Sequence, residues 1–262
     1  NNAIARIALD PPRVDAIVGL GLVRREIDPS DRDGTKAPRW EVTGAPMPDQ
    51  IAVASVGGAR YLIAVEEGDD RGAVREKGLR GTQDIGRVGD LLAWGEIDPG
   101  LLVPGAESAD RLGRLHVLID EAVRGDGLVM PGTRSIGLYS LETLERVGDT
   151  GSSIEIATLA LFSDDSRSDD RGPEPEGVIV TEIGGRNLVL ASIERPGAIA
   201  AIDIEKPDAP KLDWIYPSAW DGDLGPEGMC LIDRSDGRTL LAVCYETSGT
   251  MVVYELRRTR GE

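Results

Sequence analysis

Short apolar runs recur along the chain, and many of them are separated by turns that contain glycine. The clearest case is the pair of runs 178–183 and 188–193, which flank Gly184-Gly185. This pattern predicts β-hairpins, because Gly-Gly and Asp-Gly accept the positive φ angles of tight turns. Helical periodicity is almost absent, so the chain is predicted to be all-β. Further strands are predicted at residues 51–56, 61–65, 198–204, 229–232, 240–244 and 251–256.

A motif rich in proline, glutamate and glycine occurs twice in the last third of the chain. Residues 172–177 read Gly-Pro-Glu-Pro-Glu-Gly, and residues 225–228 read Gly-Pro-Glu-Gly. Each copy is followed by a second glutamate, Glu194 or Glu246. The two units are offset by 51 residues, which suits four strands per unit. Repeats of this length with four strands each indicate a β-propeller.

The repeated acidic residues are expected to face one another across hairpins. In an antiparallel pair, facing residues have numbers with a constant sum, and half of that sum marks the turn. For Glu176 and Glu194 the half-sum is 185, which falls on Gly184-Gly185. The same arithmetic pairs Glu227 with Glu246 and Asp49 with Glu67. We expect these carboxylates at the mouth of the propeller channel, where like charges need compensation.

The same register places Cys230 opposite residue 243, one position away from Cys244. The two cysteines would then point to opposite faces, which disfavours a disulfide between them. We expect two buried free thiols.

A cation could compensate the acidic pairs. One histidine and two cysteines are too few for a histidine-rich zinc or iron site, so oxygen ligands and calcium are favoured. The predicted metal ligands are Asp49, Glu67, Glu176, Glu194, Glu227 and Glu246. The alternative is that each carboxylate accepts backbone N–H groups or pairs with an arginine, and both interpretations stay open.

A second candidate calcium site lies in residues 27–34. Asp31, Asp33 and Gly34 match part of an EF-hand loop, but Pro29 occupies the first ligand position. An irregular calcium loop and a solvated acidic turn are both compatible with this segment.

Three arginines are candidates for anion binding. Arg167 and Arg171 alternate with aspartates in residues 164–171, and Arg71 lies in another acidic segment. Arginine binds phosphate oxygens bidentately, so these side chains could hold a phosphate beside calcium. A salt-bridged loop is the alternative interpretation.

The charge balance excludes several functions. The chain has 46 acidic and 29 basic side chains and a net charge of −17, which argues against nucleic acids and anionic membranes. No apolar run approaches the ~18 residues of a membrane-spanning helix. There is no G-x-S-x-G motif, and His116 reads as an ordinary strand residue, so no catalytic residue is assigned.

Four segments carry a family resemblance: 66–71, 167–177, 194–197 and 246–250. They read Glu-Glu-Gly-Asp-Asp-Arg, Arg-Ser-Asp-Asp-Arg-Gly-Pro-Glu-Pro-Glu-Gly, Glu-Arg-Pro-Gly and Glu-Thr-Ser-Gly-Thr. In these motifs the chain resembles the choice-of-anchor I family of mesenchyme-specific cell-surface glycoprotein-like and alkaline-phosphatase-like secreted proteins. Glu66 departs from the family, which usually has asparagine there.

The resemblance implies a secreted or surface-anchored β-propeller of about seven blades, of which this chain would supply roughly four to five. Residues 1–262 are then expected to form a single propeller domain that lacks its N-terminal blades. Those blades, or a second chain that completes the ring, would be its first partner.

The predicted function is an extracellular calcium-binding propeller that acts as a cell-surface or matrix interaction module, with a surface protein or a phosphorylated molecule as its ligand. The alternative is a calcium-dependent phosphoester hydrolase of the phytase or alkaline-phosphatase-like type.

Overall fold

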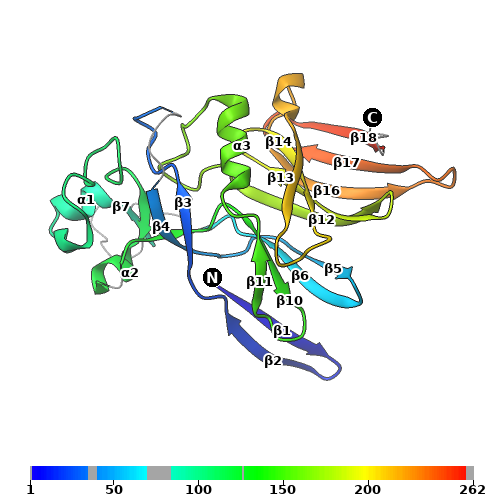
Figure 1. Cartoon of the computed structure of the whole chain (residues 1–262), viewed down its shortest axis with the longest axis horizontal. Coiled ribbons are helices and arrows are strands. Elements are labelled where there is room, and N and C mark those ends of the chain that lie inside the picture. Colours follow the sequence, from blue (N-terminus) through cyan, green and yellow to red (C-terminus); the bar gives the residue numbers. More distant parts are fainter. Residues whose placement is uncertain (1, 35–39, 70–83, 126, 258–262) are drawn as a thin grey trace. The chain divides into compact units, whose positions relative to one another are not determined.

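The computed structural model describes residues 2–34, 40–69, 84–125 and 127–257, and strands dominate it (Figure 1). The all-β prediction is confirmed. The chain forms two compact units, each built from separate stretches of sequence. The first unit contains Asn1–Pro48, Glu67–Arg134 and Thr158–Gly172, and the second contains Asp49–Glu66, Ser135–Ala157 and Pro173–Glu262. The single propeller domain over residues 1–262 stays a prediction.

The second unit contains three antiparallel sheets. The first has the order β11-β10-β6-β5, from Arg146–Asp149, Ile136–Ser140, Ala59–Val65 and Ile51–Val56. The second has the consecutive strands β12 (Pro175–Ile183), β13 (Arg186–Ile193), β14 (Ala198–Asp203) and β15 (Lys211–Tyr216). The third has β16 (Pro226–Asp233), β17 (Thr239–Tyr245) and β18 (Thr250–Leu256). Every strand predicted from the apolar runs is present.

The predicted turns are also present. Gly184 and Gly185 join β12 to β13 with φ angles of 61° and 78°, and Gly237 lies between β16 and β17 with φ of 83°. A side chain is strained at such positive φ angles, which explains why glycine occupies these positions.

The second and third sheets pack face to face. Leu190, Ile199 and Ala201 from the second sheet form one apolar core with Leu241, Val243 and Tyr245 from the third. These positions alternate along β14 and β17, as expected for strands with one inward face. Figure 1 shows β16, β17 and β18 beside β12 and β13.

The pairing register differs from the constant-sum arithmetic. A β-bulge lies between Pro175 and Val178, and the N–H of Glu194 donates to the carbonyl of Glu174 at 2.9 Å. An equivalent bulge lies between Pro226 and Met229. A bulge places an extra residue on one strand, so the direct pairing of Glu176 with Glu194 is wrong.

The other two predicted pairs are also out of register, although only the pair of Glu227 with Glu246 lies beside a bulge. The N–H of Glu246 donates to the carbonyl of Gly225 at 2.8 Å, so Glu227 does not lie directly opposite Glu246. In the hairpin after Asp49, Ile51 lies opposite Ala64 rather than Val65, so the register expected from Asp49 and Glu67 is off by one residue.

The register also changes the interpretation of the cysteines. Cys230 lies opposite Ala242, and Cys244 follows two residues later, so both thiols share one face of the third sheet. Both cysteines are free, as predicted. They are exposed, however, so the prediction of buried thiols on opposite faces is wrong. The pairing differs by one residue from the expected register, and a shift of one residue reverses the face.

The first unit is less regular. Its strands are β1 (Ala3–Leu9) with β2 (Pro12–Gly19), β3 (Val23–Ile27) with β4 (Trp40–Ala45) and the parallel β9 (Val129–Pro131), and β7 (Ile85–Arg87) with β8 (His116–Leu118). Short helices α1 (Val88–Ala93) and α2 (Ile119–Arg124) follow β7 and β8. The core gathers Ile27, Val42, Leu91, Leu115, Val117 and Met130.

The helices were missed in the sequence because they carry little periodic signal. α1 and α2 have six residues each, too few for a helical period to repeat. The longer α3 (Ser153–Phe162) is apolar on most of its sides, so polar and apolar positions do not alternate with a period of 3.6.

Ser192 and Gly177 hold the bulge of β12 against β16. The Oγ of Ser192 accepts the N–H of Gly177 at 2.7 Å and donates to the carbonyl of Glu227 at 3.1 Å. A Cβ at position 177 would lie 2.4 Å from that carbonyl oxygen.

Gly177→Ala is therefore expected to lower the free energy of unfolding by about 1–3 kcal/mol, because backbone must move to admit the methyl group. Denaturant unfolding measures the change. The matched control is Gly228→Ala in the equivalent bulge, where a Cβ meets no atom within 4 Å. Equal losses in the two variants would contradict this account of the bulge.

Candidate metal site

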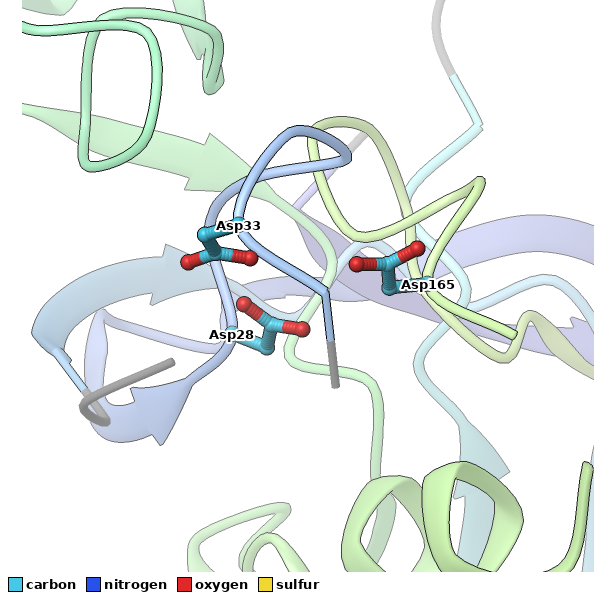
Figure 2. A group of neighbouring side chains, drawn as sticks. All are labelled: Asp28, Asp33 and Asp165. Carbon is cyan, nitrogen blue, oxygen red and sulfur yellow. The ribbon is translucent and has the colours of Figure 1, made fainter. Parts of the chain in front are cut away.

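Three aspartates of the first unit converge on one point (Figure 2). Asp28 directly follows β3, Asp33 lies five residues later, and Asp165 lies in the loop after α3. Each offers a carboxylate oxygen, and these oxygens lie within 4.8 Å of one another. Two loops that are distant in sequence therefore build one acidic cluster, which we call the aspartate cluster.

Buried Arg134 joins the two loops. Its Nη1 donates to the carbonyl of Asp28 at 2.9 Å, and its Nη2 donates to the carbonyls of Ser168 and Asp170 at 2.7 and 2.8 Å. The Oγ of Ser168 also donates to Oδ2 of Asp28 at 2.9 Å. Hydrogen bonds from a charged donor are stronger than neutral ones, so this guanidinium fixes the approach of the loops.

Further contacts fix the loop that contains Asp33. The Oγ of Ser30 donates to the carbonyl of Ala109 at 2.7 Å. Asp31 accepts two hydrogen bonds from Arg114, at 2.6 and 2.8 Å. Asp31 is therefore used in an ion pair, whereas Asp33 contributes to the aspartate cluster.

The environment of Asp33 disfavours its negative charge. Both carboxylate oxygens of Asp33 are buried and have no hydrogen-bond partner among the described residues. Burial is the main cause that raises the pKa of Asp33 to about 6, and the charges of Asp28 and Asp165 add to it. A cation bound beside Asp33 would instead stabilise its ionised carboxylate.

The geometry suits a hard cation. Calcium binds oxygen ligands at about 2.3–2.6 Å, so two ligands on opposite sides of one ion lie about 5 Å apart. The separations within the aspartate cluster are compatible with that limit. Carboxylate oxygens are also hard ligands, which calcium prefers to softer ligands such as thiolate sulfur.

Comparison with known proteins identifies the family. The model of the choice-of-anchor I domain matches residues 1–207. The chain belongs to the choice-of-anchor I family. The resemblance seen in the motifs is thereby confirmed, although the segment 246–250 lies beyond the matched residues.

One curated relative of this choice-of-anchor I chain is Gigasin-3a from Magallana gigas. It is 30% identical over 118 residues, which cover 37% of this chain and 42% of the relative. The match thus spans less than half of that protein.

Within the described ranges of the choice-of-anchor I chain, no helix is long and apolar enough to cross a membrane.

The six metal ligands predicted from sequence lie in different surroundings. In the second unit, Asp49 and Glu176 bring carboxylate oxygens within 4.8 Å of each other, and Glu194 does the same with Glu174. The metal assignment of these residues stays a prediction.

Several of these six predicted metal ligands are paired with arginine or exposed to solvent. Glu67 lies in the first unit and pairs with Arg171, while Glu194 pairs with Arg195 at 3.2 Å. Glu227 and Glu246 are exposed and belong to no acidic cluster among the described residues.

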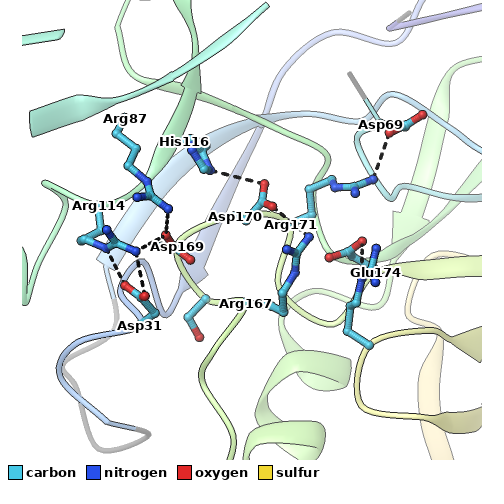
Figure 3. Close-up of polar contacts among 12 residues, drawn as sticks. Asp31, Asp69, Arg87, Arg114, His116, Arg167, Asp169, Asp170, Arg171 and Glu174 are labelled. Atoms are coloured by element: carbon cyan, nitrogen blue, oxygen red, sulfur yellow. Dashed lines mark hydrogen bonds and ion pairs between the residues drawn. The ribbon is translucent and has the colours of Figure 1, made fainter. Parts of the chain in front are cut away.

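The predicted anion-binding arginines face carboxylates (Figure 3). Arg167 pairs with Asp170 at 2.8 Å, and Arg171 pairs with Glu67 and with Asp69, the latter at 3.1 Å. These contacts fit the salt-bridged loop that was the alternative interpretation. Arg71 lies outside the described residues.

His116 lies next to this ion-pair network. It lies on β8, as a strand residue should, and its Nδ1 is 3.4 Å from Asp170. The carboxylate of Asp169 forms ion pairs with both Arg87 and Arg114, at 2.6 and 3.0 Å.

Asp28 and Asp165 were not recognised as candidate ligands in the sequence. The EF-hand pattern begins at Pro29, and the arginines are the most conspicuous feature of the segment that contains Asp165. The local sequence pattern does not predict that Asp28 and Asp165 lie close together. Their loops are joined by the hydrogen bond between Asp28 and Ser168, which are 140 positions apart.

Asp33→Asn should change the pH dependence of stability in metal-free protein. The folded state keeps the Asp33 proton up to about pH 6, whereas an unperturbed carboxyl releases it near 3.8. The contribution of Asp33 to stability is therefore present at low pH and is lost as pH rises through this window. Melting temperatures from pH 4 to 7 with chelator should fall more steeply in wild type than in Asp33→Asn.

The control for this comparison is Asp208→Asn, which removes the same charge from an exposed turn. Parallel pH profiles of wild type and Asp33→Asn would contradict the unfavourable environment of Asp33.

Proposed function

We propose that this chain is part of an extracellular calcium-binding β-propeller that acts as a cell-surface or matrix interaction module. The propeller is supported by the second unit, where two successive sheets start with Pro-Glu-Gly at Pro175 and Pro226, 51 residues apart. Both starts carry the same bulge, and the two sheets pack face to face. Repeated sheets that pack in this way are typical of propeller blades.

Calcium binding is supported above all by the carboxylate of Asp33. Its oxygens are buried beside two further carboxylates, without hydrogen bonds from the described residues. Burying an ionised group in this way is costly unless a cation or a proton neutralises it. Calcium would supply that charge and accept several oxygens at once.

The interaction role is supported by family membership and by charge. Choice-of-anchor domains suit a protein held at a surface, and the net charge of −17 favours basic partners and bound cations. Phosphoester hydrolysis has weaker support, because Arg167 and Arg171 already pair with carboxylates.

Calcium titration of the chelator-treated protein tests the proposal. We expect near-stoichiometric binding by calorimetry. Saturation at about 100 times the dissociation constant would contribute about 2.7 kcal/mol, or roughly 5–10 °C in melting temperature. The double variant Asp33→Asn/Asp165→Asn should lose this response.

Glu227→Gln/Glu246→Gln is the matched control, since it removes two of the carboxylates predicted from sequence and leaves the aspartate cluster intact. Wild type that neither binds calcium nor shifts its melting temperature would overturn the proposal. A response lost in the control but kept in the aspartate variant would move the site to the glutamates.

A further inference from the structure

Trp220 is the most exposed of the four tryptophans, at 66%. It belongs to the short helix η2 (Ser218–Asp221), which connects β15 to β16 in the second unit. A large aromatic ring in water forgoes the stabilisation that burial would give it. Exposed rings of this kind are enriched where proteins contact their partners.

Hydrogen bonds hold η2 in place. Buried Ser218 donates its hydroxyl to the carbonyl of Gly197 at 2.9 Å, and the N–H of Ala219 donates to the same oxygen at 2.9 Å. The N–H of Asp223 returns to the carbonyl of Ser218 at 3.2 Å. The backbone that carries the Trp220 ring is therefore fixed, so a partner that binds there orders little further structure.

Two carboxylates lie in the same turn. Asp221 directly follows Trp220, and Asp223 lies two positions further along the chain. Asp221 accepts the hydroxyl of Tyr216, and Oδ1 of Asp223 accepts the hydroxyl of Thr250 at 2.7 Å. Neither hydroxyl carries a positive charge, so these contacts orient the carboxylates without compensating them.

The tyrosine behind the turn reports its negative charge. The hydrogen bond to Asp221, together with partial burial, raises the pKa of Tyr216 to about 12, and the charges of Asp221 and Asp223 add to the shift. The same potential favours a cation on the exposed side of the turn.

The adjacent segments add negative charge and no positive charge. The N–H of Glu246 donates to the carbonyl of Gly225 at 2.8 Å, which joins residues 246–250 to the turn. Residues 217–228 and 246–250 contain no lysine or arginine. Arg195, between β13 and β14, is already paired with two glutamates. A positive charge that complements this surface must therefore come from a partner.

We propose that Trp220, Asp221 and Asp223 bind an arginine side chain of a partner polypeptide, with the guanidinium stacked on the indole ring and paired with the aspartates. A planar guanidinium stacks on aromatic faces and also pairs with carboxylates, so one arginine complements both parts of this surface. Leu224 follows Asp223 and is 41% exposed, which offers an apolar contact for the aliphatic stem of the arginine.

The partner is a basic segment of another protein. The net charge of −17 attracts such a segment to the chain, and the turn at Trp220 gives it a defined place to bind. This inference rests on the interaction role proposed above, for which it names the surface and the partner, and it needs no calcium.

A labelled peptide, Gly-Arg-Gly-Arg-Gly-Arg-Gly, is the probe, and the same peptide with citrulline in place of arginine is its neutral counterpart. Fluorescence anisotropy in EDTA and about 0.15 M NaCl measures binding to the full chain, because this salt concentration screens long-range attraction. We expect the citrulline peptide to bind roughly tenfold more weakly or worse. Equal binding of the two peptides would overturn the proposal.

Trp220→Ala should weaken binding of the arginine peptide roughly tenfold or more, since an aromatic anchor dominates such contacts. Its melting temperature should stay close to that of wild type, because the ring is exposed. Trp94→Ala is the matched control, since Trp94 is 54% exposed and lies in the first unit at the end of α1. A Trp220→Ala protein that binds the peptide as wild type does would also overturn the proposal.

Asp221→Asn/Asp223→Asn should weaken binding by a similar factor, because asparagine keeps the hydrogen-bond acceptors of the turn and removes its charge. The control Asp120→Asn/Asp208→Asn removes two exposed carboxylates elsewhere in the chain. Equal losses in the two double variants would reduce the attraction to net charge and contradict a defined arginine site. Every measurement is made in EDTA, so a failure of calcium binding and a failure of this interaction are distinguishable.

Discussion

The guanidinium of Arg134 is buried in the first unit and donates hydrogen bonds to the carbonyls of Asp28, Ser168 and Asp170. These acceptors belong to two acidic loops that would otherwise repel each other. Arg134 therefore joins the loops through their backbones and leaves the carboxylates of the aspartate cluster to face one another. The hydrogen bond from Ser168 to Asp28 and the pairing of Arg114 with Asp31 and Asp169 add to this constraint.

Elsewhere the acidic excess is balanced by arginine. The buried carboxylate of Glu66 pairs with Arg146 at 2.5 Å and accepts a hydrogen bond from the hydroxyl of Tyr139 at the same distance. Asp31 and Asp169 share Arg114 in the same manner. The aspartate cluster differs because the pKa of Asp33 is raised there, whereas the arginine beside Asp31 lowers the pKa of that carboxyl. This contrast distinguishes a candidate cation site from a structural ion pair more sharply than the density of acidic residues does.

The sheets of the second unit show how a local irregularity sets a register. The bulges at the starts of β12 and β16 shift the carboxylates that simple hairpin arithmetic places side by side. Ser192 then uses the shifted backbone to connect Gly177 with Glu227.

Local sequence was sufficient for the hairpins, the repeated Pro-Glu-Gly starts of β12 and β16 and the family motifs. Turn glycines and alternating side chains act over a few residues, so their effect can be read without knowing what packs on them. The bulges could not be foreseen, because one extra residue leaves the apolar pattern nearly unchanged and is fixed by contacts between neighbouring sheets. The aspartate cluster was recognised in part, through Asp33. Asp28 and Asp165 were added by the fold, since burial and the hydrogen bonds of Arg134 bring together loops that the linear chain keeps far apart.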